Sequence, residues 1–267
     1  MYGVLDDTRL ADIATAIREK TGVEKTYKTA EMPVGIDAVY TAGKTKERSD
    51  FWDAFQQNGA RTNYNYAFGG EGWNDETFKP KYDIVPTANP GSMFYMAAIT
   101  DLEAALEKAG VIMDLSRNSN FPNTFYNASF TVIPMVDFSG AANTASPFTL
   151  TFMNNSELVT VRKIKLPSNG EQKFDRTFDG CSKLNSIEFE GVIGRSISFS
   201  SSPLSLASLK NIITHLKDYS ETTSEHVYTI TLKSSVFESL EAEKATSPNG
   251  NTWAEYIDDL KWNLVKA

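Results

Sequence analysis

Histidine and cysteine, the side chains that most often carry nucleophilic or metal chemistry, are scarce in this chain of 267 residues. There is one cysteine, Cys181, and there are two histidines, His215 and His226. A single cysteine excludes an intrachain disulfide framework and a zinc site built from cysteines. Cys181 has no evident base nearby and is expected to be a small buried filler. His215 lies on the polar side of an expected helix and His226 precedes an expected strand amid polar residues, so we expect them to be solvated or to cap a helix.

Carboxylates are the remaining candidates for acid–base chemistry, because 34 Asp and Glu outnumber 26 Lys and Arg and give a net charge of -8. A glycosidase needs two carboxylates at a set separation across a cleft, and no such pair is evident. Glu188 and Glu190 alternate on an expected strand and should share one solvated face. The run Gly69–Gly72 lacks the Lys and hydroxyl residue of a phosphate-binding loop. We therefore expect no catalytic residue, no cofactor and no bound metal.

The excess of acidic over basic residues also indicates which kinds of binding partner are disfavoured. A nucleic-acid-binding protein needs a basic patch that displaces counterions from phosphates. An anionic membrane surface likewise attracts basic segments. A net charge of -8 disfavours both kinds of partner. The segment Met1–Ala16 has no basic and no apolar stretch of the secretory type, and no apolar run approaches the length of a membrane-spanning helix, so neither is expected.

Aromatic side chains make up 12% of the chain and are dense between residues 51 and 93. Tyr64, Tyr66, Phe68 and Trp73 form the densest group there. Such residues either pack as a small core or form an exposed face that binds carbohydrate or protein, and both interpretations stay open. We take Tyr64, Tyr66 and Trp73 as candidate binding residues and expect irregular backbone in this region.

A short segment recurs in the middle of the chain. Thr124–Ser129 (TFYNAS) is followed by Thr151–Ser156 (TFMNNS) and Thr177–Ser182 (TFDGCS), and their phenylalanines at 125, 152 and 178 are 27 and 26 residues apart. Apolar stripes follow the second and third copies. A fixed period in the twenties with a short strand per repeat is typical of a solenoid. Side chains alternate along such strands, which makes four exposed positions further candidates for a binding surface: Lys163, Lys165, Glu188 and Glu190.

Other elements are expected around these repeats. We expect a helix at Asp101–Lys108, a first strand at Val111–Leu115, a capping helix in Pro203–Tyr219, a strand at Val227–Leu232, and two helices opened by the capping boxes Ser235/Glu238 and Thr252/Glu255. Near the N-terminus, amphipathic spacing over Asp7–Thr21 predicts a short helix that ends at Gly22, followed by a second short helix. The chain thus divides into an N-terminal helical anchor and linker (1–50), an aromatic-rich connecting region (51–93), a repeat array (94–202) and a C-terminal α/β cap (203–267).

The repeat pattern, T-F-x-x-small-S followed by L-x-x-I-x-L/F, resembles the BspA-like leucine-rich repeat family over about Phe94 to Phe199. The resemblance implies an α+β chain in which a short helical region precedes a leucine-rich-repeat solenoid with helical caps. A second resemblance lies in Leu10–Arg18, Thr21–Gly22, Thr29–Pro33 and Ile36, which look like the opening of tail, baseplate and fibre proteins of bacteriophages. It implies a virion or surface-adhesion role and assigns no catalytic residues.

Three functions follow as hypotheses. The first is a structural protein of a phage particle that assembles with other virion proteins and binds a host-surface glycan or protein. Such a protein is made in the host cytoplasm, lies outside after lysis, and is expected to be a homo-oligomer, with a trimer favoured. The second is a bacterial cell-surface adhesin with the same repeats, which would need an export signal or wall anchor. The third is a cell-wall glycan hydrolase, which no motif supports.

Overall fold

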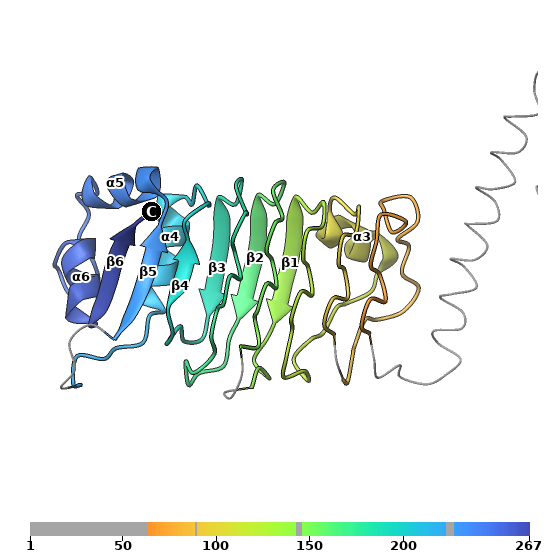
Figure 1. Cartoon of the computed structure of the whole chain (residues 1–267), viewed down its shortest axis with the longest axis horizontal. Coiled ribbons are helices and arrows are strands. Elements are labelled where there is room, and N and C mark those ends of the chain that lie inside the picture. Colours follow the sequence, from red (N-terminus) through yellow and green to blue (C-terminus); the bar gives the residue numbers. More distant parts are fainter. Residues whose placement is uncertain (1–63, 89, 143–145, 223–226) are drawn as a thin grey trace, which may run out of the picture. The chain divides into compact units, whose positions relative to one another are not determined.

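A computed structural model describes residues 64–88, 90–142, 146–222 and 227–267 (Figure 1). The chain divides into two compact units, residues 1–59 and 60–267, and all described residues belong to the second. The helix expected at Asp7–Thr21, its successor, the expected anchor and linker at 1–50, and His226 lie outside the described residues.

Six strands and four helices occur in the described part of the second unit. In chain order they are α3 (Leu102–Ala109), β1 (Val132–Asp137), β2 (Thr160–Lys165), β3 (Ser186–Glu190), β4 (Ile197–Phe199), α4 (Leu206–Thr214), β5 (Tyr228–Leu232), α5 (Ser234–Glu241), α6 (Trp253–Asp259) and β6 (Trp262–Lys266). The strands make two parallel sheets of three strands each, in the orders β1-β2-β3 and β4-β5-β6 (Figure 1).

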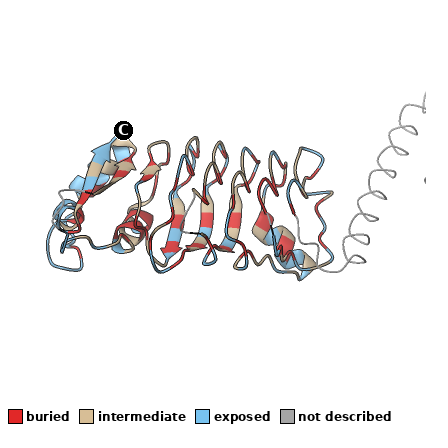
Figure 2. Ribbon diagram, turned by 60° about the horizontal axis from the view of Figure 1, so that its bottom comes forward, coloured by how far each residue is buried: buried red, intermediate tan, exposed pale blue. Residues whose placement is uncertain are grey.

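Alternation of side chains gives each strand one buried face. Val161 of β2 lies opposite Ile133 of β1 on one side and Ile187 of β3 on the other, and all three are buried. Successive strands therefore contribute apolar side chains to a common interior, as the red bands on β1 to β3 show in Figure 2. Burial of these β-branched side chains is the main force that holds the parallel strands in register.

A column of stacked phenylalanines fills the interior behind the sheet. Phe94, Phe125, Phe152 and Phe178 stack in order, with ring centroids 5.6, 5.2 and 5.4 Å apart and interplanar angles of at most 8°. Phe68 extends the column by one ring, 5.1 Å from Phe94. All five side chains are buried. The column thus includes two phenylalanines, Phe68 and Phe94, that precede the three copies of the recurring segment.

Backbone hydrogen bonds link each copy to the next. The amide of Phe94 donates to the carbonyl of Thr124, and the amide of Phe125 donates to that of Thr151, at 2.8 and 2.9 Å. The buried hydroxyls of Thr151 and Thr177 also donate to the carbonyls of Phe121 and Phe148, each three residues before the preceding copy. The polar groups of these irregular segments are therefore satisfied inside the molecule, as buried backbone requires.

The expectation of a leucine-rich-repeat solenoid is wrong. The structure is a mixed α/β arrangement with two separate three-stranded sheets and four short helices rather than one continuous ladder with a strand in every repeat. The first sheet ends at β3 because helix α4 covers its edge. There, the amide of Ile187 donates to Ser208 Oγ at 2.9 Å, and the amide of Phe189 donates to Asn211 Oδ1 at 2.7 Å. Side chains of a helix therefore take the hydrogen bonds that a further strand would have made.

Several local expectations are confirmed and two are wrong. Helix α3 begins after the N-cap Asp101 and ends at Gly110, whose φ of 67° needs a glycine. Helices α4 and α6 and strand β5 lie within or near their expected ranges, and the capping box of Thr252 with Glu255 is present. The segment Val111–Leu115 is not a strand and makes only an isolated bridge at Met113. Helix α5 begins without a side-chain cap, so the expected capping box at Ser235 is wrong.

Candidate functional site

Three tyrosines, Tyr66, Tyr95 and Tyr126, line up outside the phenylalanine column, and we call them the tyrosine strip. Tyr95 and Tyr126 are stacked with ring centroids 5.0 Å apart and an interplanar angle of 7°. Tyr66 meets Tyr95 edge-on at 5.6 Å. Tyr66 is 57% exposed, and the other two are half-buried. The strip therefore leaves part of each of its three aromatic rings accessible to solvent.

Local backbone holds these rings in place. Tyr95 and Tyr126 directly follow the buried Phe94 and Phe125, so one residue points inward and the next outward. The carbonyl of Tyr126 accepts the amide of Met96 at 2.9 Å, and the carbonyl of Tyr95 accepts the amide of Gly70 at 2.7 Å. The strip therefore rests on a backbone ladder with a packed core behind it, which lowers the entropy lost when a partner binds.

The chemistry of the strip follows from its stacking. Because Tyr95 and Tyr126 cover each other's faces, they offer hydroxyl groups and ring edges to solvent, whereas Tyr66 offers more of its ring. A phenolic hydroxyl both donates and accepts hydrogen bonds, and Tyr126 Oη accepts one from Asn154 Nδ2 at 3.3 Å. The residues after Tyr95 and Tyr126 in the chain, Met96 and Asn127, and the matching residues of the next copy, Met153 and Asn154, are uncharged. The strip thus suits a neutral partner with hydroxyl or amide groups.

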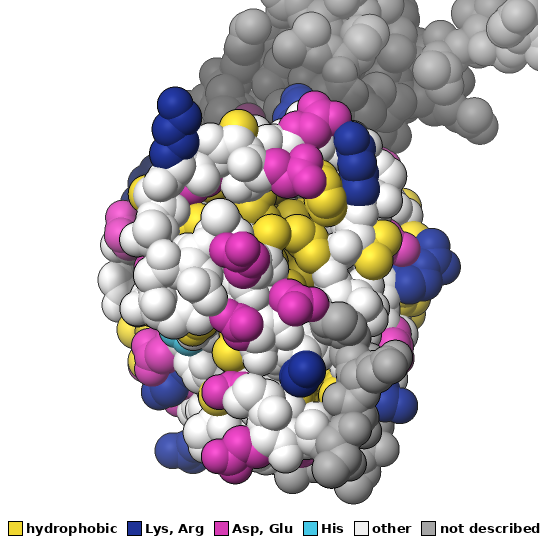
Figure 3. Space-filling view, turned by 90° about the vertical axis from the view of Figure 1, so that its left-hand side faces the viewer, with side chains coloured by type: hydrophobic (Ala, Val, Ile, Leu, Met, Phe, Trp, Pro, Cys, Tyr) yellow, Lys and Arg dark blue, Asp and Glu magenta, His cyan; other side chains and the backbone are white. Residues whose placement is uncertain are grey.

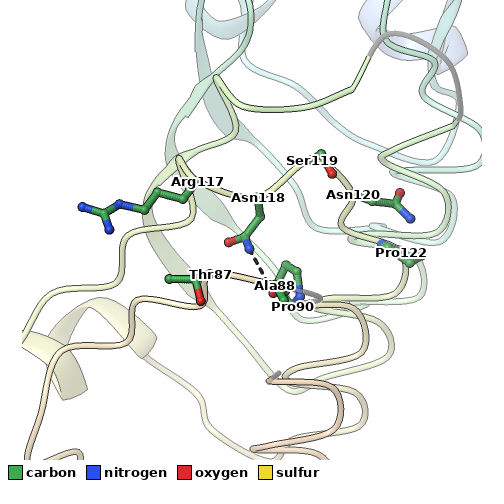
Figure 4. A pocket seen from close by; sticks show the side chains of 8 residues that line it. All are labelled: Thr87, Ala88, Pro90, Arg117, Asn118, Ser119, Asn120 and Pro122. Atoms are coloured by element: carbon green, nitrogen blue, oxygen red, sulfur yellow. Dashed lines mark hydrogen bonds between the residues drawn. The ribbon is translucent and has the colours of Figure 1, made fainter. Parts of the chain in front are cut away.

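A pocket of about 260 Å³ opens between two loops (Figure 4). Its lining residues are Thr87, Ala88, Pro90, Arg117, Asn118, Ser119, Asn120 and Pro122. The side chain of Asn118 is buried at its floor, with a relative exposure of 3%. Its Nδ2 donates to the carbonyl of Ala88 at 2.9 Å, while its Oδ1 has no hydrogen-bond partner. A buried acceptor without a partner is costly, so this atom is a candidate contact for a ligand.

The expected site residues divide between core and surface. Tyr64 and Trp73 are buried and pack around Phe68, so the binding role considered for them is wrong and the core alternative holds. Tyr66 is exposed and belongs to the strip. Sequence reasoning missed Tyr95 and Tyr126, although each follows a column phenylalanine and that recurrence was a usable signal.

The charged candidates lie together on the outer face of the first sheet. Lys163 Nζ is 3.7 Å from a carboxylate oxygen of Glu190, Lys165 pairs with Asp137 at 3.3 Å, and Glu188 is exposed beside them. The pKa of Asp137 is lowered: burial opposes the shift, and hydrogen bonds from Ser139 and then from Lys165 outweigh it. Exposed pairs of this kind contribute little to stability. The face carries mixed, mutually neutralised charge rather than a patch of one sign.

A second polar group lies where the two sheets adjoin. Glu171 accepts hydrogen bonds from Arg195 and from Lys217, the latter at 3.0 Å. The Lys217 bond in particular, with the charge of Arg195, lowers the pKa of Glu171. Burial raises the pKa of Tyr219, whose hydroxyl donates to the carbonyl of Gly194 at 2.7 Å. A carboxylate held by two cations is a poor general acid or base near neutral pH, so this group serves to join loops.

The cysteine and the one histidine among the described residues, Cys181 and His215, have structural surroundings. Cys181 is buried, its Sγ donates to the carbonyl of Phe152 at 3.0 Å, and burial raises its pKa to about 12. A thiol with such a pKa is unreactive at neutral pH, which confirms it as a buried filler. His215 ends α4, where its Nδ1 contacts the carbonyl of Asn211 at 2.7 Å, as expected for a helix cap.

The end of the unit that carries α5, α6 and β6 forms another surface (Figure 3). Apolar side chains gather there among acidic ones. At this end Val265 is exposed, and Phe237 and Leu264 are half-buried. Strand β6 is also the edge of its sheet.

Two further findings limit the chemistry of the described residues. No group of three or more His, Cys, Asp or Glu in them is arranged to hold a metal ion. None of their helices is long and apolar enough to cross a bilayer. Comparison of the chain with protein-family models, with curated proteins and with solved structures finds no match.

Proposed function

We propose that this chain is a structural and binding protein of a bacteriophage particle, in the tail, the baseplate or a capsid fibre, and that it contacts its partner through the tyrosine strip. The strip carries the binding part of the proposal. Tyrosine supplies large contact area at low entropic cost and is enriched in binding hot spots. Here Tyr66 is exposed, Tyr95 and Tyr126 are half-buried, and the buried phenylalanine column lies behind them.

The phage setting is supported by the resemblance of Leu10–Arg18 and the segments after it to the openings of phage tail, baseplate and fibre proteins. Proteins at such positions are usually symmetric homo-oligomers, and we propose a trimer. Light scattering on the whole chain measures this directly, and a monomer at every concentration would contradict it. The proposed partners are other virion proteins and a glycan or protein of the host surface.

Attachment of the purified whole chain to bacterial cells of the source strain tests the strip. Tyr95→Phe with Tyr126→Phe removes two hydroxyl groups but keeps the stacked rings, and Tyr66→Ser removes the most exposed ring without disturbing the core. We expect each variant to weaken attachment by roughly tenfold or more, the usual effect of losing a hot-spot contact. Tyr256→Phe on helix α6 is the matched control and should leave attachment unchanged.

The outcomes separate the proposal from its alternatives. Attachment that is equally strong in wild type, Tyr66→Ser and the double phenylalanine variant would contradict a binding role for the strip. A lytic band from the purified chain on a gel that contains cell walls would contradict a non-catalytic role.

A further inference from the structure

The pocket floored by Asn118 lies in the same two stretches of chain as the tyrosine strip. Its lining prolines, Pro90 and Pro122, precede Tyr95 and Tyr126 by five and four residues respectively. Thr87, Ala88, Ser119 and Asn120 are exposed around its mouth, while Pro90 and Asn118 are buried. The pocket therefore has an open, polar rim and a floor that combines an apolar ring with one amide.

The chain around Asn118 is held firmly, so the unpaired oxygen is a fixed feature of the floor. The backbone amide of Asn118 donates to the carbonyl of Leu115 at 3.0 Å. The backbone carbonyl of Ser119 accepts a hydrogen bond from the backbone amide of Ala142 at 2.8 Å. A Cβ at Gly140 would collide with the carbonyl oxygens of Ser116 and Asn118, so only glycine permits this close approach. Figure 4 shows Asn118 Nδ2 directed to Ala88 and Oδ1 directed away from it.

The lining selects the chemistry of the ligand. Arg117 is the only charged residue among the eight, it is exposed, and its side chain points away from the others in Figure 4. With no carboxylate to balance an ammonium group, the free acceptor on Asn118 calls for a neutral O–H or N–H donor. The groups at the rim, on Thr87, Ser119 and Asn120, both donate and accept hydrogen bonds, as sugar hydroxyls do.

The size of the pocket limits the ligand further. Its volume of about 260 Å³ is just below the ~300–1,000 Å³ of pockets that enclose drug-sized molecules. One six-membered sugar ring therefore suits it, and an oligosaccharide would have to extend beyond the rim. The rings of Pro90 and Pro122 offer apolar surface to the C–H face of such a ring.

We propose that this pocket binds a single neutral pyranose unit, with Asn118 Oδ1 accepting a hydroxyl or acetamido hydrogen of the sugar. The inference deepens the proposed binding function and rests on it for its biological meaning, since a sugar unit of a host-surface glycan is the natural source of the ligand. Binding of one small ring through few contacts is weak, with a dissociation constant on the order of 1 mM.

The test uses the whole chain and methyl glycosides of glucose, galactose and N-acetylglucosamine, with saturation-transfer NMR and calorimetry. We expect at least one glycoside to bind. Ser119→Trp places a bulky ring over the pocket from an exposed position and should abolish binding, while Ser129→Trp, an exposed serine away from the pocket, should retain it. Asn118→Leu should also abolish binding. If that variant does not fold, Thr87→Val and Ser119→Trp still test the site.

Two results would overturn the proposal: a folded wild type that binds none of the glycosides, or equal binding by wild type and Ser119→Trp. A wild type that binds a charged amine but no neutral glycoside counts against it as well. Failure of the pocket is distinguishable from failure of the strip. The Tyr95→Phe/Tyr126→Phe variant should bind the free glycoside normally even where it loses attachment to cells.

Discussion

Replacing Phe152 by alanine tests whether the phenylalanine column supports the tyrosine strip. Phe152 is 1% exposed and lies between Phe125 and Phe178, with centroids 5.2 and 5.4 Å away and rings nearly parallel. A buried aromatic side chain covers ~150–250 Å². At ~25 cal/mol per Å² this corresponds to about 4–6 kcal/mol. Alanine keeps part of that area but leaves a cavity, so we expect a loss of about 3–5 kcal/mol in the free energy of unfolding.

Leucine at the same position separates ring stacking from simple burial. Phe152→Leu keeps most of the apolar volume but loses two stacked contacts, each contributing ~0.5–1.5 kcal/mol beyond area burial. Its expected cost is therefore about 1–3 kcal/mol, clearly less than that of alanine. Phe237→Ala provides a control, because Phe237 is half-buried on helix α5 and lies outside the column.

Urea unfolding followed by far-ultraviolet circular dichroism measures these differences from the shift in midpoint at constant m. The expected order of stability is wild type, then Phe152→Leu and Phe237→Ala, and Phe152→Ala last. A Phe152→Ala variant no less stable than Phe237→Ala would refute the reasoning, since the column would then not be a principal source of stability.

Three further predictions concern single sites. Burial raises the pKa of Cys181 to about 12, so its thiol should resist Ellman's reagent at about pH 8 in the native protein and react after unfolding; rapid native reaction would contradict this. The hydrogen bond from Lys217 holds the pKa of Glu171 below the ordinary 4.5, so its stabilisation is present above that value and lost as pH falls through the folded pKa. Glu171→Gln should therefore cost ~1 kcal/mol near neutral pH, after allowance for solvent screening, and progressively less in acid; a cost independent of pH would contradict it. Gly194→Ala places a Cβ against the carbonyl oxygen of Gly170 and forces the backbone to move. We expect it to lower the free energy of unfolding by about 1–3 kcal/mol in the same urea assay. An unchanged midpoint would contradict the close approach of these two glycines.

The sequence was most informative where a pattern is local and periodic. The apolar stripes after the second and third copies predicted a short strand in each of these repeats, where β2 and β3 lie, and the apolar spacing in Pro203–Tyr219 predicted a helix, where α4 lies. The same reasoning overextended the repeat into one continuous solenoid. The first sheet ends at β3 because Ser208 and Asn211 of α4 bind the edge of that strand, and no local pattern in the sequence reveals this tertiary contact.

The candidate sites were only partly predictable for a related reason. Phe68 and Phe94 escaped the repeat pattern because alanine and methionine precede them where later copies have threonine. Tyr64 and Tyr66 are two residues apart, yet one is buried and the other exposed, because Tyr66 has a positive φ of 53° that breaks simple alternation. The pocket joins Asn118 to Ala88, 30 residues away in the chain, and asparagine in a polar loop gives no signal of burial.

The location of the chain in a phage particle is the central claim, and quantitative mass spectrometry of density-banded particles from lysed cultures of the source strain tests it most directly. The account predicts that the chain bands with the particles in a constant ratio to the main shell protein. Recovery of the chain in the cell-envelope fraction, with none in the particle band, would contradict the account and favour a bacterial adhesin.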